Sequence, residues 1–412
     1  ALEFSGGELR HITEKTSGVT VAARQSWLFY ESSQGHGQNS GAYIFRPRTG
    51  DARPVFDGAP TLSVVRGAVG DEVHQNFGPW VSQRIRLAKG ARHVEVTYTV
   101  GPIPVDDLVG REVVSRITTD IQSGGECFTD SNAREMQRRR RDFRPTWSLN
   151  QTEPVSGNYF PVVAAAFIRD ERKQLTILTD ASQAGSGCVR DGELEMMVHR
   201  RLLVDDVRGL NDVLNETEFV EPWVGPEKTR GRLYGPGLIT RGKHFWTVGA
   251  PSTAAQVWRP LVDAVYMPLQ PFFAGAASEL GSSTSSFLLQ PLPPNVQIVT
   301  LEAWDDSRTL LRLAHQFGLG EDAALSQPAT IDLRALFAHS EVKSVDERGL
   351  AVTISRDEVL RRRIQWRAEG DVGSPPQADE SKERNEFQVT LGPLQIRTFL
   401  LELAPRVSAV IV

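Results

Sequence analysis

The sequence has 412 residues, of which 40% are hydrophobic and 24% charged, a balance typical of a folded globular protein rather than a disordered chain. Its 46 basic and 51 acidic residues give a formal net charge of −5, so the chain as a whole lacks the basic character of a nucleic-acid binder. No apolar run approaches the roughly 18 residues that a membrane-spanning helix needs, and we predict no membrane span.

Period-two alternation of apolar and polar residues recurs along the chain. The clearest runs cover residues 93–100, 174–178, 296–301, 387–391 and 394–400. One face of each run is largely apolar, as a half-buried antiparallel strand requires. The 35 glycines and 24 prolines separate such runs at short intervals and favour many short strands over long helices. We predict an all-β fold of large stacked sheets, with the best helical candidates at 131–141 and 331–339.

A change in strand length predicts a domain boundary near residue 325. Long strands continue to residues 309–317, and shorter strands follow the polar segment 320–322. A polar segment between two blocks of strands is typical of a junction. We therefore expect a large β-domain at 1–325 and a smaller β-sandwich at 326–412.

The start of the chain and its two cysteines leave alternatives open. Residues 1–4 have neither the basic region nor the apolar region of a signal peptide, and a strand-like run begins at Leu9. We interpret this start as that of an internal fragment or of the product of a cut. Cys127 and Cys188 could form one disulfide or remain two buried thiols, since neither belongs to a Cys-x-x-Cys motif.

Motifs for metal and nucleotide chemistry are missing from the sequence. None of the eight histidines is spaced as His-x-His, His-x-Asp or His-Glu-x-x-His, so we expect no zinc site built from this chain alone. No glycine-rich phosphate loop and no Gly-x-Ser-x-Gly motif occurs. Nucleotide binding and serine-hydrolase chemistry therefore receive no support.

The strongest local charge feature is the arginine run 138–141. It could bind phosphate or an acidic partner, because guanidinium groups form paired hydrogen bonds with such anions. It could equally be a solvated face with ion pairs to Asp130, Glu135 or Asp142. The negative net charge of the chain favours the second interpretation.

A second polar stretch follows the apolar run that begins near residue 193. Arg200 and Arg201 end this run, and Asp205 and Asp206 precede a glycine turn. Opposite charges at the end of a strand suit the polar rim of a pocket for a hydroxyl-rich ligand such as a sugar. A strand end held by salt bridges is the alternative, and the residues alone favour it slightly.

Two sequons fit the pattern for N-linked glycosylation. They begin at Asn150 and Asn215, and neither has proline at the middle position. Two sequons are near the number expected by chance in a chain of this length. They hint at a secretory route and establish nothing more.

Several longer motifs, taken in order, resemble the carboxy-terminal half of the lysosomal α-mannosidases of glycoside hydrolase family 38. The matching runs are SGAYIFRP at 40–47, EVHQNF at 72–77, VGPIPV at 100–105, FTDSN at 128–132, RPTW at 144–147, LNQTEPVSGNY at 149–159, MVHRRLL at 197–203 and IRTFL at 396–400. They run in register over essentially the whole chain, with a weaker match from about residue 219 to 292.

This resemblance implies a division of labour between two parts of an enzyme. Family members carry zinc, an aspartate nucleophile and a second carboxylic acid on an amino-terminal barrel, and cleave α-mannosides with retention. The chain would then be the β-rich half of a cleaved enzyme: a large β-supersandwich like that of galactose mutarotase, followed by a smaller β-sandwich. Its partner would be the amino-terminal catalytic chain of the same precursor, which would bind the zinc. The substrates would be mannose-containing oligosaccharides of N-glycans.

The resemblance also implies site residues and a cellular setting. Tyr43 matches a tyrosine that reaches the bound mannose, and Arg200 or Arg201 matches a residue near the sugar. Asp206, with Asp205 and Arg208, would support them. A lysosomal or similar acidic compartment and a higher oligomer of the two-chain unit would follow. The alternatives are a stand-alone carbohydrate-binding β-sandwich protein and, more weakly, a protein that docks partners through its arginine run.

Overall fold

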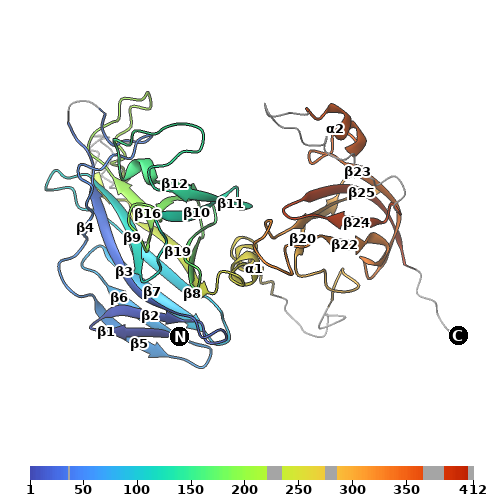
Figure 1. Ribbon diagram of the computed structural model, residues 1–412, viewed down its shortest axis with the longest axis horizontal. Coiled ribbons are helices and arrows are strands. Elements are labelled where there is room, and N and C mark those ends of the chain that lie inside the picture. The colour runs from blue at the N-terminus through green and yellow to red at the C-terminus, as the bar shows by residue number, and fades with distance from the viewer. Residues whose placement is uncertain (36–37, 220–233, 274–284, 365–384, 407–412) are drawn as a thin grey trace, which may run out of the picture. The chain divides into compact units, whose positions relative to one another are not determined.

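The computed structural model describes residues 1–35, 38–219, 234–273, 285–364 and 385–406. Contacts divide the chain into two compact units, Ala1–Pro268 and Leu269–Val412. Nearly all regular structure is antiparallel β-sheet (Figure 1). The predicted all-β fold is therefore confirmed. No described helix is long and apolar enough to cross a membrane.

The first unit contains two large sheets. One has eight strands in the order β1-β2-β3-β9-β16-β15-β12, with β4 paired to β3, and the other has nine in the order β11-β10-β13-β14-β19-β8-β7-β6-β5. The strands of the eight-stranded sheet are β1 (Leu2–Ser5), β2 (Glu8–Thr13), β3 (Thr20–Glu31), β4 (Arg53–Pro54), β9 (Arg111–Thr119), β12 (Phe160–Val162), β15 (Gln183–Ser186) and β16 (Glu193–Arg201). Those of the nine-stranded sheet are β5 (Thr61–Arg66), β6 (Gly70–Asn76), β7 (Val81–Ala88), β8 (Val94–Val100), β10 (Glu126–Ser131), β11 (Glu135–Arg140), β13 (Ala165–Arg169), β14 (Gln174–Thr179) and β19 (Thr240–Gly249).

The core of the first unit lies between these two sheets. It joins side chains such as Val21 and Ile117 of the eight-stranded sheet to Ile85, Leu175 and Trp246 of the nine-stranded sheet. Strand β8 alternates buried and half-buried residues along its length, as its sequence predicts. Two further strands, β17 (Thr217–Phe219) and β18 (Tyr234–Gly237), pair with each other, and the helix α1 (Ala255–Tyr266) ends the unit. The first unit is thus a large β-sandwich.

The second unit is a smaller β-sandwich. A four-stranded sheet in the order β20-β21-β25-β23 packs with the pair β22-β24 around one apolar core. Its elements are β20 (Val296–Ala303), β21 (Arg308–His315), β22 (Ala329–Asp332), β23 (Ser340–Arg348), α2 (Arg356–Arg362), β24 (Gln388–Leu391) and β25 (Ile396–Pro405).

The predicted boundary at residue 325, between domains 1–325 and 326–412, differs from the observed division between Pro268 and Leu269. A cut at 325 would separate β20 and β21 from β25, which pairs with β21 along seven residues from Arg308↔Glu402 to Ala314↔Ile396. Strands that share one sheet and one core fold as a unit. The polar segment that we took for a junction is a loop within the second unit.

Both predicted helices are wrong. Residues 131–141 form the turn and second strand of the β10–β11 hairpin, because Asn132 and Ala133 adopt positive φ angles of 52° and 58° and reverse the chain. Residues 331–339 contain the end of β22 and a short 3-10 turn, Leu333–Ala335. In both cases an apparent helical spacing arose from a strand that meets a turn.

Candidate functional site

The loop that carries Tyr43 is a tight turn after strand β3. The Gly41 N–H donates to the Ile44 carbonyl at 2.9 Å, which closes the turn. The Ser40 hydroxyl accepts from the Arg46 N–H at 2.7 Å and donates to the Arg46 carbonyl at 3.0 Å. The backbone on both sides of Tyr43 is therefore fixed by its own short-range hydrogen bonds.

Asp206 fastens this turn to a second loop. Its side chain is 2% exposed, and its Oδ2 accepts from the backbone N–H groups of Tyr43 at 2.7 Å and Ile44 at 3.2 Å. Its Oδ1 accepts from the Arg208 N–H at 3.1 Å. A Cβ on Gly41 would lie 2.4 Å from the Cβ of Asp206, so only glycine leaves room for this contact. The predicted site residues Tyr43 and Asp206 are thus in direct contact through backbone.

Glu112 and Arg200 also stabilise the turn that carries Tyr43. The Arg200 Nη2 donates to the Ile44 carbonyl at 2.8 Å and to Glu112 Oε1 at 2.6 Å, while the Ser40 hydroxyl donates to Glu112 Oε2 at 3.1 Å. Glu112 is completely buried. Burial raises the pKa of its carboxyl, and the charge and hydrogen bond of Arg200 and the hydrogen bond of Ser40 oppose that rise. Sequence reasoning missed Glu112, which no motif marked.

Arg201 belongs to a different environment from Arg200. Neighbouring residues of a strand point to opposite faces, and Arg201 donates to the Ile103 carbonyl and to Asn215 Oδ1, each at 2.7 Å. A Cβ on Gly237 would lie 2.4 Å from its Nη1. Of the two predicted arginines, Arg200 contacts the Tyr43 loop and Arg201 does not.

The ring of Tyr43 is presented to the outside. Its side chain is 66% exposed, and its hydroxyl makes no hydrogen bond to any residue that the structure describes. A tyrosine that belonged to the core would be buried, so Tyr43 is not a core residue. Tyr43 therefore combines a fixed backbone with a hydroxyl that is free to donate and to accept a hydrogen bond.

Exposed apolar side chains gather on the loops next to Tyr43, and sequence reasoning missed them too. Val207 is 75% and Leu108 is 77% exposed, and both have positive φ angles, 57° and 60°. The loop of Leu108 contacts the start of the Tyr43 segment, where the Ser32 N–H donates to the Gly110 carbonyl at 2.9 Å. A β-branched residue in this conformation is strained, and such strain clusters at functional sites. The two loops thus present exposed apolar residues to the outside, of which the β-branched Val207 is strained.

A buried polar network underlies the loop. Glu195 accepts from the Tyr30 hydroxyl at 2.9 Å and from Arg116 Nε at 2.6 Å, and Tyr159 also donates to it. Phe45, two residues after Tyr43, packs edge-on against both Tyr30 and Tyr159 with ring centroids 5.6 and 4.7 Å away. Burial and the Glu195 charge raise the pKa of Tyr30 above its ordinary value. The network provides a rigid floor for the turn.

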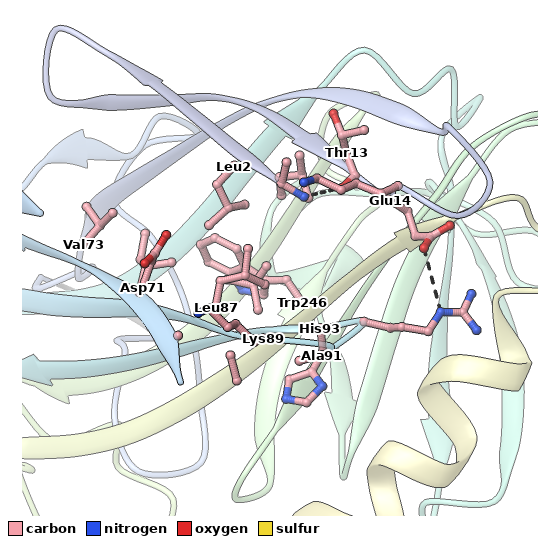
Figure 2. Close-up of a pocket in the computed structure, with 18 of the residues that line it drawn as sticks. Leu2, Thr13, Glu14, Asp71, Val73, Leu87, Lys89, Ala91, His93 and Trp246 are labelled. Atoms are coloured by element: carbon pink, nitrogen blue, oxygen red, sulfur yellow. Dashed lines mark hydrogen bonds and ion pairs between the residues drawn. The ribbon is translucent and has the colours of Figure 1, made fainter. Parts of the chain in front are cut away.

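A polar hollow of about 400 Å³ adjoins the Tyr43 loop. Its lining includes Arg46, Arg48 and Glu153, and Arg46 forms an ion pair with Glu153 at 2.9 Å. A larger hollow of about 820 Å³ lies elsewhere in the first unit and is not lined by Tyr43 (Figure 2). Tyr43 is therefore on an open surface, and its loop adjoins a polar hollow.

The described residues do not fit a zinc ion. No group of three or more histidine, cysteine, aspartate or glutamate side chains that could hold a metal occurs in the described ranges. Zinc in proteins takes at least three such ligands. No chemical step can therefore be assigned here to a metal bound by these residues.

The arginine run 138–141 makes contacts within the chain. Arg138 donates to Glu126 at 3.0 Å, and Arg139 donates to Thr129 at 3.0 Å. The ion pair with Glu126 differs from the partners that the sequence suggested, because β10 and β11 face each other in a hairpin. The run resembles an internally paired strand face more than a free anion site.

The remaining predicted sites lie at two kinds of position. Asn150 and Asn215 are both exposed. The Oδ1 of Asn215 accepts a hydrogen bond from Arg201, which leaves the side-chain nitrogen of Asn215 free to carry a glycan. Cys127 and Cys188 are both buried, and their sulfur atoms lie 2.7 Å apart. Glycosylation and the disulfide stay predictions.

Comparisons with known proteins match nearly all of this chain. The profile of the family described as "Glycosyl hydrolases family 38 C-terminal domain" matches residues 1–208, half of the chain. The chain belongs to glycoside hydrolase family 38. It is 42% identical to the lysosomal alpha-mannosidase of Mus musculus and 40% identical to that of Homo sapiens, each over 96% of this chain. It is 36% identical to the alpha-mannosidase of Canavalia ensiformis, again over 96% of this chain.

The family 38 relatives are much longer than this chain. It spans 38% of the mouse and human proteins and 40% of the Canavalia ensiformis protein. The crystal structure of an alpha-mannosidase from Enterococcus faecalis V583 matches 97% of this chain and 41% of its own, with a TM-score of 0.60 and 13% identity. At that identity the likeness concerns the fold alone.

Proposed function

We propose that this chain is the β-rich part of a lysosomal-type, zinc-dependent retaining α-mannosidase that removes α-linked mannose from N-glycan oligosaccharides. In this proposal it closes one wall of the sugar pocket and contributes the Tyr43 hydroxyl to it. The observation that carries the proposal is an exposed tyrosine on a turn whose backbone is clamped by buried groups, in a family 38 chain.

The chemistry of Tyr43 suits a sugar contact. A phenol can donate to and accept from a sugar hydroxyl, while its ring offers an apolar surface to the pyranose. Asp206 and Arg200 fix the turn before a ligand arrives, so binding would not have to order the loop. Tyr43 would therefore bind and orient the sugar.

In this proposal the catalytic groups come from a separate catalytic part of the same precursor. The described residues of this chain provide no zinc site, and the proposal assigns the zinc, the nucleophile and the acid to that part. Exposed Leu108 and Val207 beside Tyr43 support burial of this end of the sandwich against it. The lysosomal relatives support an acidic compartment, where glycans on Asn150 and Asn215 and a higher oligomer are further expectations.

The proposal is tested by Tyr43→Phe in the assembled enzyme. Loss of one hydrogen bond to a sugar should lower kcat/KM by about 1–2 kcal/mol, with unchanged thermal stability. Tyr266→Phe is the matched control, since its hydroxyl donates to the Val163 and Thr179 carbonyls in another part of the sandwich and its loss should leave kcat/KM unaltered. An unchanged kcat/KM in Tyr43→Phe would remove Tyr43 from the site.

The alternative is a carbohydrate-binding β-sandwich protein that never meets a catalytic part. The polar hollow beside Arg46 and Glu153 is the observation that favours it, since a sugar could bind there without a partner. Native size-exclusion chromatography followed by a denaturing gel separates the two functions. A copurifying polypeptide of comparable or larger size supports the enzyme, and a single chain supports the binding protein.

A further inference from the structure

A hollow in the first unit lies at one end of the sandwich, between the β1–β2 hairpin and strands β5–β7. Its volume of about 820 Å³ lies within the range of about 300–1,000 Å³ that small-molecule pockets occupy. Figure 2 shows Leu2, Val73, Leu87 and Trp246 around the same space. Val73 and Trp246 also belong to the core, so the pocket opens directly onto the apolar interior.

The floor of this pocket contains an unsatisfied donor. Trp246 is 1% exposed, and its indole Nε1 has no hydrogen-bond partner among the described residues. A buried tryptophan N–H usually finds an acceptor, because an unpaired one loses its hydration without compensation. A ligand oxygen in line with the Nε1–H bond, in the plane of the indole, would supply the missing acceptor.

The rim of the pocket is positively charged. Lys15, Arg66, Lys89 and Arg92 line it, against Glu14 and Asp71. Asp71 forms an ion pair with Arg66. A side-chain hydrogen bond from Ser17 is the main cause that lowers the pKa of Glu14 to about 2. Lys15 and Lys89 are exposed and form no salt bridge with the described part of the chain. Two cations therefore remain to attract an anion.

Lys89 and Trp246 lie at the same end of the pocket. Trp246 pairs with Val94 at the start of β8, directly after the turn that Lys89 begins. Figure 2 shows the side chains of Lys89, Ala91 and His93 beside Trp246. Burial lowers the pKa of His93, so it adds no charge at neutral pH. Lys89 and the unpaired N–H of Trp246 thus lie at one polar end of an otherwise apolar pocket.

We propose that this pocket binds a single-chain amphiphile with an anionic head group, such as a fatty acid. Its hydrocarbon would lie on Leu2, Val73 and Leu87, and its carboxylate would face Lys89, with Lys15 contributing charge at the rim and an oxygen within reach of Trp246 Nε1. This site is separate from Tyr43, so the inference does not rest on the function proposed above.

The test is a calorimetric titration of the full-length protein, in its native assembly, with dodecanoate. The expected result is saturable one-site binding that neutral dodecyl maltoside and cationic dodecyltrimethylammonium do not reproduce. Absence of saturable binding would overturn the proposal. We would expect this result if another part of the full-length protein covered the pocket. Equal binding of the cationic amphiphile would also overturn it.

Charge-reversal variants locate the site. Lys15→Glu with Lys89→Glu should weaken dodecanoate binding at least tenfold, because both exposed lysines are removed from the rim. Arg172→Glu is the matched control: Arg172 is exposed on the β13–β14 turn, outside the pocket, and its reversal should change nothing. Equal affinities in both variants would contradict the assignment. Trp246→Phe keeps an aromatic side chain, though a smaller one, and removes the N–H; it should weaken binding while circular dichroism shows a folded protein.

Discussion

Tyr43 owes its position to side chains far from it in sequence. Asp206 is 163 residues away and binds the Tyr43 N–H, and Arg200 binds the Ile44 carbonyl next to it. Because these contacts are made by buried or half-buried charges to backbone, they restrain the turn without covering the ring. Asp206 and Arg200 are therefore positioning residues, and Tyr43 is the group that can meet a ligand.

We expect Asp206→Asn to act through Tyr43. The variant keeps one acceptor oxygen but loses charge-assisted bonds to the backbone, at a cost of about 1–3 kcal/mol in the free energy of unfolding. Steady-state kinetics on the assembled enzyme should show a fall in kcat/KM. Added to Tyr43→Phe, it should lower kcat/KM by less than the sum of the single effects. Strictly additive losses would show that Asp206 does not act through Tyr43.

Glu112 should give the stability a recognisable pH dependence. Its pKa is raised in the folded protein above the ordinary value of 4.5, because the carboxyl is buried. From 4.5 up to that raised pKa, the folded state holds a proton that the unfolded state has lost, so the free energy of unfolding falls as pH rises. Urea unfolding at a series of pH values measures this slope. Glu112→Gln should remove that component, and an identical slope in the variant would contradict the assignment.

The turn of the Tyr43 loop depends on one glycine. An alanine at position 41 would place its Cβ 2.4 Å from the Cβ of Asp206, so the two loops must separate. We expect Gly41→Ala to cost about 1–3 kcal/mol of stability, as overpacking does, and to lower kcat/KM.

Gly35→Ala provides a matched comparison for this element. A Cβ at Gly35, in the segment that leads to the same turn, would meet nothing within 4 Å. Thermal unfolding and kinetics should therefore be close to those of the parent protein. If Gly41→Ala behaved like Gly35→Ala, the contact between the two loops would not matter for the site.

Strands that alternate regularly were predictable, and turns were not. β8 follows its predicted run because one face of it meets the core. β25 also lies on its predicted run, although four of its consecutive residues are buried. The β10–β11 hairpin was mistaken for a helix because its reversal uses Asn132 and Ala133 with positive φ, which alanine rarely adopts. Strand β14 is buried at all six positions, a consequence of its central place in the sheet that its own sequence does not reveal.

The site was predictable only where a motif carried it. Tyr43 and Asp206 came from the resemblance, and the structure brings them together. Glu112 and Glu195 were missed because a buried carboxylate is marked by its partners, which come from distant strands. Which of Arg200 and Arg201 contacts the Tyr43 loop depends on the register of β16, since adjacent residues face opposite sides of the sheet.

At the scale of the whole molecule, the domain boundary could not be predicted from local sequence patterns. β20 and β21 precede the predicted boundary yet share a sheet with β25, about 90 residues later. Pairing over such a separation is invisible in composition. The family, by contrast, was predictable, because long motifs recur in the same order across the chain and the profile and the relatives match it.

The central claim is that this chain completes a sugar pocket whose reacting groups belong to another polypeptide. The most direct measurement compares hydrolysis of an α-mannoside by the isolated chain, by the catalytic part of the same precursor, and by the two together. The account predicts no turnover by the isolated chain and zinc-dependent turnover by the combination, several-fold higher than with Tyr43→Phe in place of the parent chain. Zinc-dependent hydrolysis by the isolated chain, or full activity of the catalytic part without it, would contradict the account.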